Sequence, residues 1–218
     1  MRRLLILTGL AAALLLAGCP RPAPDEKGVF LLIDTSGTYN QELKKGHRII
    51  SYILSRMNPG DHFAVGRIDT DSFSEKNIVA STTFAQRPST ANQEKRRFRS
   101  RIKQFTDGIE PSAYTDITGG ILQASGWLAE SGAEQKVILI LSDLKEDLPE
   151  DYVRDDVTLQ LSGYEVVALN VTKLSGDIVD PRKYMGRVDS WRQRVEEAGG
   201  TWRMINDLEH MTGLFETK

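Results

Sequence analysis

The chain has 218 residues, of which 40% are hydrophobic and 27% charged, a composition typical of one globular domain with a sizeable core. The 28 basic and 30 acidic residues nearly balance, at a formal net charge of −2. This balance excludes the strongly basic footprint of a nucleic-acid-binding protein, so nucleic acid is not an expected partner.

The amino terminus combines a basic start, an apolar run and the only cysteine of the chain. Arg2 and Arg3 precede the apolar residues 4–16, which are too few to span a bilayer comfortably. Leu16-Ala17-Gly18-Cys19 follows and resembles the signal of bacterial lipoproteins. The resemblance implies a signal peptide at residues 1–18 and an amino-terminal Cys19 that carries palmitate-type acyl chains. Two or more such chains hold a protein durably on a membrane.

Residues 19–27 are expected to be the lipidated cysteine and a Pro-rich tether, followed by one domain at residues 28–218. At roughly 3.1 Å per residue, residues 20–27 reach only about 25 Å, so the domain should lie close to the lipid. Removing Arg2 and Arg3 leaves 26 basic against 30 acidic residues, a mature charge of −4. Pro20, rather than Asp, follows Cys19, which favours the outer membrane in a Gram-negative host. Whether the domain faces the periplasm or the exterior stays open.

Apolar runs alternate with helical stripes through the rest of the chain. Strands are expected at residues 29–33, 63–68, 78–84, 137–141, 166–171 and 202–205. Helices are expected at residues 39–57, from 90 to about 105, at 117–128 and 184–198, and in a short closing segment after 206.

This alternation predicts a Rossmann-like, doubly wound α/β domain. Its mostly parallel six-stranded sheet should carry helices on both faces. The loop at residues 69–72 is short enough to make one strand pair an antiparallel hairpin.

One expected helix is very basic. Thr90 and Gln93 predict a capping box at its start. Basic side chains then surround its apolar positions, at Lys95, Arg96, Arg97, Arg99 and Arg101. They could form a patch for phosphate groups or a lipid surface, but a solvated helix face is the favoured interpretation.

The most informative stretch is the apolar run 29–33, which ends in a carboxylate and two hydroxyl residues. Asp34, Ser36 and Thr38 would lie together at the carboxyl end of a central strand, where ligands bind in open α/β sheets. Hard oxygen donors with one charge suit Mg²⁺ or, less selectively, Mn²⁺ or Ca²⁺. The alternative is an ordinary polar turn.

Asp34-x-Ser36-x-Thr38 after the first strand, Thr115 before a helix and Asp143 after the fourth strand resemble a von Willebrand factor A domain with a metal-ion-dependent adhesion site. The resemblance implies that these five residues hold one Mg²⁺. It also implies a protein partner whose Asp or Glu completes the coordination sphere. Thr38 replaces the family's second serine but keeps the hydroxyl group.

Neighbouring residues have supporting functions in this interpretation. Asp116 is expected to cap a helix or to accept a hydrogen bond near the site rather than to bind the metal. Thr118, Gly119 and Gly120 are small enough to let their helix approach closely. Leu144 is a departure, because many family members have glycine after the aspartate.

The stretch 34–38 also resembles the nucleophile loop of haloacid-dehalogenase-type phosphatases, with Asp34 as nucleophile. Ser142, Lys145 and the acidic segment with Gly176, Asp177 and Asp180 could match the other motifs of that family. Against this, Ser36 occupies the position of the general acid/base, and serine cannot move protons usefully near neutral pH. A helix also starts too soon after Thr38 to leave room for a flap. We therefore expect a binding protein and not an enzyme; a structural lipoprotein with a vestigial site is a third possibility.

Several loop acids are expected near the same edge of the sheet, namely Asp69, Asp71, Glu146, Asp147, Asp177 and Asp180. Solvated loop charge is the favoured interpretation, and a rim that selects partners is the alternative. The three histidines, His47, His62 and His210, fall on different elements and suggest no catalytic arrangement.

Overall fold

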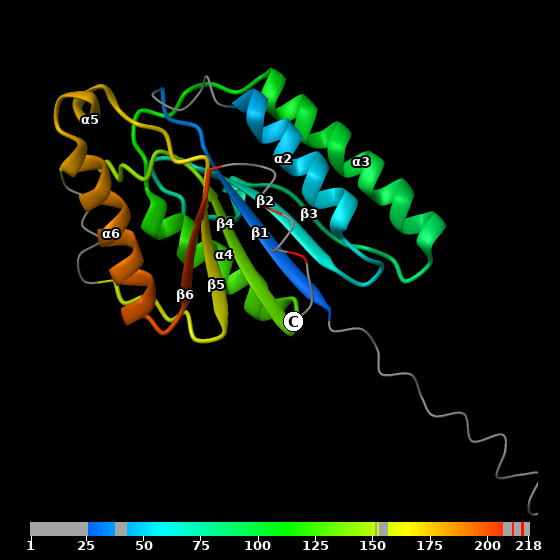
Figure 1. Cartoon of the computed structure of the whole chain (residues 1–218). Coiled ribbons are helices and arrows are strands. Elements are labelled where there is room, and N and C mark those ends of the chain that lie inside the picture. Colours follow the sequence, from blue (N-terminus) through cyan, green and yellow to red (C-terminus); the bar gives the residue numbers. More distant parts are fainter. Residues whose placement is uncertain are drawn as a thin grey trace, which may run out of the picture.

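The computed structural model describes residues 26–37, 43–150, 152, 157–206, 211 and 215. Its centre is a six-stranded sheet in the order β3-β2-β1-β4-β5-β6 (Figure 1). The strands are β1 (Lys27–Asp34), β2 (His62–Ile68), β3 (Ile78–Thr83), β4 (Gln135–Leu141), β5 (Tyr164–Leu169) and β6 (Thr201–Ile205). The predicted signal peptide, Cys19 and most of the predicted tether lie outside the described residues.

The central strands form because their side chains are apolar on both faces. All the apolar residues from Val29 to Ile33 are at most 1% exposed, as expected for a strand covered on both sides. β1 pairs in parallel with β2 and β4, and β5 pairs in parallel with β4 and β6. The predicted doubly wound, mostly parallel sheet is therefore confirmed.

The single antiparallel pair, β2 with β3, is also confirmed. Its connection is longer than the predicted short loop, because β2 ends at Ile68 and a short 3₁₀ helix, η2 (Glu75–Asn77), precedes β3. The register shifts at Val65/Gly66, so one strand contains an irregularity that the apolar pattern does not reveal.

Helices cover both faces of the sheet. α2 (Leu43–Arg56) and α3 (Pro88–Asp107) pack on one face, and α4 (Ile117–Glu130) and α6 (Pro181–Glu197) pack on the other (Figure 1). A further helix, α5 (Ser175–Val179), was not predicted, since it is short and has no apolar stripe. Apart from Met211 and Phe215, the expected closing helix lies outside the described residues.

The predicted capping box of the basic helix is wrong. α3 begins at Pro88, and Arg87 at the N-cap position makes no side-chain capping bond. Proline is favoured in the first helical turn because its fixed φ suits the helix and its missing N–H is not needed there. Pro88 therefore places the start of the helix before Thr90.

Close packing positions α4 against the sheet. A Cβ atom at Gly120 would lie 3.2 Å from Cδ2 of Leu32, so glycine lets this helix approach β1. Among the described residues, no helix has both the length and the apolar character that crossing a bilayer requires.

Candidate metal-binding site

The candidate site lies where β1, β2 and β4 end. Asp34 is the last residue of β1 and pairs in register with Ile68, while Ile33 pairs with Leu141. Ser142 and Asp143 directly follow that leucine, so the sheet brings the ends of β1 and β4 side by side. This edge is opposite the end where β1 begins at Lys27 (Figure 1).

The Asp34 carboxylate is fully buried at this edge. Its Oδ1 accepts a hydrogen bond from the Ser36 backbone N–H at 2.8 Å, and its Oδ2 accepts one from the Ser142 hydroxyl at 2.6 Å. Burial raises the pKa of Asp34; hydrogen bonds from Ser142 and Ser36 oppose the rise, and the nearby Asp143 charge adds to it. The environment therefore disfavours the ionised form of Asp34, and a bound cation would stabilise that form.

The loop after β1 is tied to its neighbours. Thr35 donates from its hydroxyl to the Ile68 carbonyl oxygen at 2.8 Å, and the Ser112 N–H donates to the Thr35 carbonyl oxygen at 2.9 Å. Ser36 is 7% exposed and forms an isolated bridge with Ser112. Thr38, the third predicted ligand from this loop, lies outside the described residues.

Thr115 is held by its backbone. Its N–H donates to the Asp147 carbonyl oxygen at 2.7 Å, and the Asp147 N–H donates to its own carbonyl oxygen at 3.0 Å. This bridge joins the segment before α4 to the loop after β4. Within the described part of the chain, the Thr115 hydroxyl makes no hydrogen bond, although the residue is only 4% exposed.

Asp116 is the N-cap of α4, one of the two functions expected for it. Its Oδ1 accepts from the Gly119 N–H at 2.8 Å, and its Oδ2 accepts from the Ser72 N–H at 3.1 Å. The Asp116 N–H in turn donates to the Asp69 carbonyl oxygen at 3.0 Å. One carboxylate oxygen thus caps α4, and the other holds the loop after β2 next to Thr115.

The loop after β4 is held in an unusual backbone conformation. Leu144 has a φ of 64°, in the left-handed region that favours glycine. The Leu144 side chain is 1% exposed and packs in the core. Many members of the resembling family have glycine at this position; here burial of the leucine offsets the backbone strain.

One face of α6 holds this loop in place. Arg187 donates from Nε to the Asp143 carbonyl oxygen at 2.9 Å, and Trp191 donates from Nε1 to the Leu144 carbonyl oxygen at 3.0 Å. Arg194 contacts the Glu146 carboxylate at 3.2 Å. These three residues have the i, i+4, i+7 spacing of one helix face. We call them the α6 clamp.

Buried ion pairs fix the clamp itself. Arg187 donates to both oxygens of Asp177, at 3.0 and 2.8 Å, and this bonding lowers the pKa of Asp177 to about 2. Glu146 also accepts from the N–H of Thr118 at 2.6 Å and from its hydroxyl at 3.0 Å. The loop that carries Asp143 is therefore joined to α4, α5 and α6.

These contacts correct the interpretation of two loop acids as solvated charge. The Asp177 and Glu146 side chains are only 2% and 19% exposed, and both are in ion pairs. The sequence does contain a signal for the clamp, namely the spacing of Arg187, Trp191 and Arg194. The spacing does not reveal what this helix face contacts.

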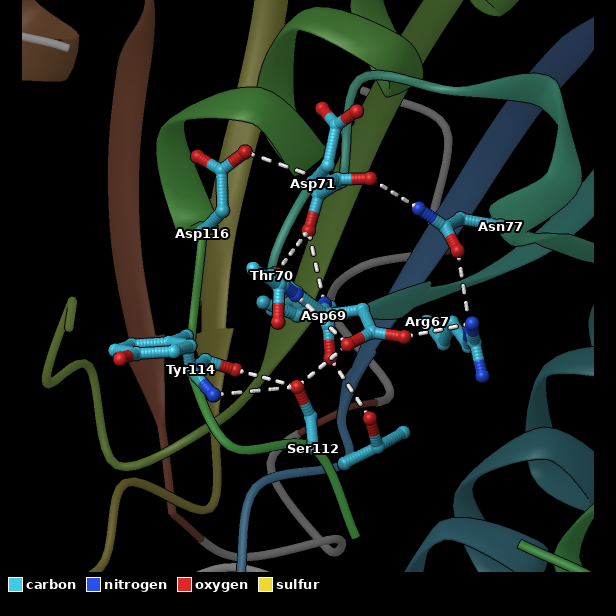
Figure 2. Close-up of polar contacts among 11 residues, drawn as sticks. Arg67, Asp69, Thr70, Asp71, Asn77, Ser112, Tyr114 and Asp116 are labelled. Carbon is cyan, nitrogen blue, oxygen red and sulfur yellow. Dashed lines mark hydrogen bonds and ion pairs between the residues drawn. The ribbon is translucent and has the colours of Figure 1, made fainter. Parts of the chain in front are cut away.

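A second polar network surrounds Asp69, at the end of β2 (Figure 2). Ser112 donates from its hydroxyl to Asp69 Oδ1 at 2.5 Å, and Arg67 pairs with Oδ2 at 2.6 Å. Partial burial raises the pKa of Asp69, but the bonds from Ser112 and Thr70 and the charge of Arg67 outweigh burial, so the net pKa is lowered. Asp69 therefore orients the segment that leads to Thr115 and Asp116.

Four of the five predicted ligands lie in the described part of the chain. Asp34, Ser36, Thr115 and Asp143 come from three loops that are bonded to one another at one edge of the sheet. Among the residues in the described ranges, no three acidic, histidine or cysteine side chains gather as a metal site. The predicted set has only two carboxylates and needs its hydroxyl groups, which suits Mg²⁺ chemistry.

No sequence-family profile and no curated protein matches the chain. Several solved structures share its fold. A von Willebrand factor type A protein from Catenulispora acidiphila superposes with a TM-score of 0.52 at 14% identity, covering 88% of this chain and 41% of that one. The D319A mutant of the PilB minor pilin from Streptococcus sanguinis gives 0.51 at 15% identity, covering 90% and 61%.

The pilus adhesin SpaC from Lactobacillus rhamnosus GG also gives a TM-score of 0.51, at 12% identity, with 89% of this chain and 29% of that chain covered. This chain thus spans less than two thirds of the length of each of these proteins. At such low identity the likeness establishes the fold. The described residues between 27 and 205 share the fold of a von Willebrand factor A domain.

Proposed function

We propose that this chain is a lipid-anchored binding domain that holds Mg²⁺ through Asp34, Ser36, Thr38, Thr115 and Asp143. A carboxylate from a protein partner completes the coordination sphere. Mg²⁺ prefers oxygen ligands, and two carboxylates with three hydroxyls leave it electrophilic towards an outside Asp or Glu. Mn²⁺ or Ca²⁺ could replace it with lower selectivity.

The observation that carries this proposal is the buried Asp34 carboxylate beside Asp143. Burial and the Asp143 charge both raise the pKa of Asp34, so additional positive charge beside these two acids would stabilise the ionised carboxylate. A divalent cation would supply that charge. The Thr115 hydroxyl, which makes no hydrogen bond to the other described residues, offers a further oxygen ligand at this edge.

Catalysis by Asp34 has less support. The carboxylate is 0% exposed, and both of its oxygens already accept hydrogen bonds from Ser36 and Ser142. A phosphatase nucleophile must be open to its substrate. α2 begins at Leu43, five residues after Thr38, which leaves little chain for a flap. We therefore infer a binding function rather than phosphoryl transfer.

The membrane part of the proposal rests on Cys19 and on residues 1–18. In a Gram-negative host the anchor would place the domain on the outer membrane, facing the periplasm or the exterior. The fold neighbours include a minor pilin and a pilus adhesin, which supports a function in protein–protein contact at the cell surface.

The direct test is metal binding followed by partner capture. Isothermal titration of the purified full chain with Mg²⁺ should show one site, and the Asp143→Asn variant should lose it. Immobilised full chain should then retain a specific membrane-extract protein in Mg²⁺ but not in EDTA. Mg²⁺ binding that survives in Asp143→Asn, or a partner that ignores EDTA, would contradict the proposal.

A further inference from the structure

The basic helix α3 carries a surplus of positive charge. Arg96, Arg97, Arg99 and Arg101 are exposed, and among the described residues none of them has an ion-pair or aromatic partner. The two acids of the helix are engaged elsewhere: Glu94 accepts from the Ala85 N–H at 2.8 Å, and Asp107 pairs with Lys103. Local acids therefore do not neutralise these arginines.

Two of these arginines face a groove. A cavity of about 190 Å³ lies between α3 and β3 and is lined by Ala80, Ser81 and Thr82 on the strand and by Glu94, Arg97, Phe98 and Arg101 on the helix. The two arginines outnumber Glu94, whose carboxylate already accepts a hydrogen bond from the Ala85 N–H. Arg97 and Arg101 are one helical turn apart, so their guanidinium groups lie along the groove. Arg96 and Arg99 do not line it.

The strand beside this groove is an edge strand. β3 pairs only with β2, so the backbone groups along its outer side have no strand partner within the described residues. Ser81 and Thr83 are exposed on this strand. An exposed edge is a template on which an extended segment can add as a further strand.

We propose that the β3 edge and Arg97 and Arg101 form a docking groove for an extended acidic segment of a partner protein. Backbone hydrogen bonds to β3 would supply affinity for any strand, and the two arginines would select acidic side chains. The same charges repel a second copy of this edge, which disfavours self-association. The groove is separate from the metal site, which lies at the ends of β1 and β4.

A lipid surface fits these features less well. The apolar residues Phe98 and Ile102 of α3 are buried against the sheet, so the helix has no apolar face to insert into a bilayer. Lipid headgroups also cannot pair with the backbone of an edge strand along its length. An acidic strand satisfies both the charge and the backbone groups.

The test measures fluorescence anisotropy of a labelled peptide of alternating Glu and Val, matched to the six residues of β3, with the purified full chain in mild detergent. We expect binding that weakens with salt and is equal in Mg²⁺ and in EDTA. Arg97→Gln/Arg101→Gln should weaken it at least about tenfold, since hydrogen bonds to charged groups are worth about that much each. Arg97→Lys/Arg101→Lys should retain most of the binding.

Matched controls separate the groove from general charge. Arg96→Gln/Arg99→Gln removes the same charge from the same helix and should weaken binding less than about threefold, as expected for screened exposed charges. A peptide of equal charge with prolines at alternate positions should not bind, because proline lacks the N–H that strand pairing needs.

Four results would overturn the proposal. They are no binding of the Glu-Val peptide, equal loss in the two double Gln variants, equal binding of the proline peptide, and arginine-dependent binding to phosphatidylglycerol vesicles without binding to the peptide. Thermal unfolding of each variant should match the unsubstituted protein, because exposed glutamine is tolerated in helices.

Discussion

The indole Nε1 of Trp191 donates a hydrogen bond of 3.0 Å to the carbonyl oxygen of Leu144, the residue directly after Asp143. Leu144 has a φ of 64°, so its carbonyl has an orientation that few leucines adopt. The bond stabilises this conformation and with it the loop that carries one predicted metal ligand. It joins two residues 47 positions apart in the sequence.

Trp191→Phe should therefore lower the free energy of unfolding by about 1–3 kcal/mol, because a buried carbonyl loses its donor. It should also weaken Mg²⁺ binding. Chemical denaturation and calorimetric titration measure the two effects. Trp127→Phe on α4 is the matched control, because the Trp127 indole donates no hydrogen bond within the described residues. Equal Mg²⁺ affinity in Trp191→Phe and the unsubstituted protein would show that the clamp does not position Asp143.

Substituting Thr115 allows metal binding to be tested without disturbing the fold. Its backbone pairs with Asp147, and its hydroxyl makes no hydrogen bond to other described residues. Thr115→Ala should change the free energy of unfolding by less than about 0.5 kcal/mol but weaken Mg²⁺ binding at least about tenfold. Thr115→Ser keeps the hydroxyl and should bind Mg²⁺ nearly as well as threonine. If both variants bind Mg²⁺ equally, Thr115 is not a ligand.

Replacing Asp34 should have opposite effects on the stability of the fold and on Mg²⁺ binding. Asp34→Asn removes a buried charge beside Asp143 while keeping an amide group that can bond to Ser36 and Ser142. In metal-free buffer the free energy of unfolding of the variant should be higher by on the order of 1 kcal/mol, so it should unfold at a higher temperature. The variant should not bind Mg²⁺. Asp116→Asn is a useful contrast, because its amide NH2 cannot accept the hydrogen bond from the Ser72 N–H, so this variant should be destabilised. An Asp34→Asn variant that unfolds at lower temperature would contradict this account.

The Arg187–Asp177 pair predicts how acid affects stability. The pKa of Asp177 falls from its usual 3.8 to about 2 in the folded protein, so the unfolded chain binds the proton more readily. The pair therefore contributes stability above about pH 4, and the contribution is lost as the pH falls from about 4 to about 2. Arg187→Met should be less stable than the unsubstituted protein at neutral pH, and the difference should shrink over this window. In Arg192→Met, an exposed site on α6, no comparable change is expected.

The proposed lipid anchor has its own test. Cys19→Ser should leave an uncleaved precursor that takes up no radiolabelled palmitate, because the acyl chains are attached to the cysteine sulfur and the new amino terminus. Metabolic labelling and membrane extraction measure both. A Cys19→Ser protein that is processed and extracted like the unsubstituted one would rule out the lipoprotein assignment.

The strands were predictable because their signal is local. The residues of β1 from Val29 to Ile33 are apolar without interruption, and such a run is sufficient to indicate a strand buried on both faces. The proximity of Asp34 and Asp143 was predictable from the sheet topology, since the carboxyl ends of neighbouring parallel strands lie at one edge of the sheet. No side-chain detail was needed for either inference.

The clamp could not be predicted, because it depends on pairings distant in the sequence. Arg187 bonds to Asp143, 44 residues away, and to Asp177 across the turn from α5. The helical period places Arg187, Trp191 and Arg194 on one face but does not say which loop that face contacts. The start of α3 was missed for a local reason, since Pro88 determines it and the Thr90 pattern does not.

If Cys19 anchors the protein as proposed, the direction of β1 determines how far from the membrane the candidate site lies. From Lys27 to Asp34 the strand is eight residues long, or about 26 Å at 3.3 Å per residue. With Cys19 in the lipid as proposed, a tether of about 25 Å adds to this length. The site would then face away from its own bilayer at a height of at most about 50 Å, and only partners that come within this distance of the bilayer could bind it. Shortening the tether would lower the height of the site above the bilayer without changing any contact in the domain.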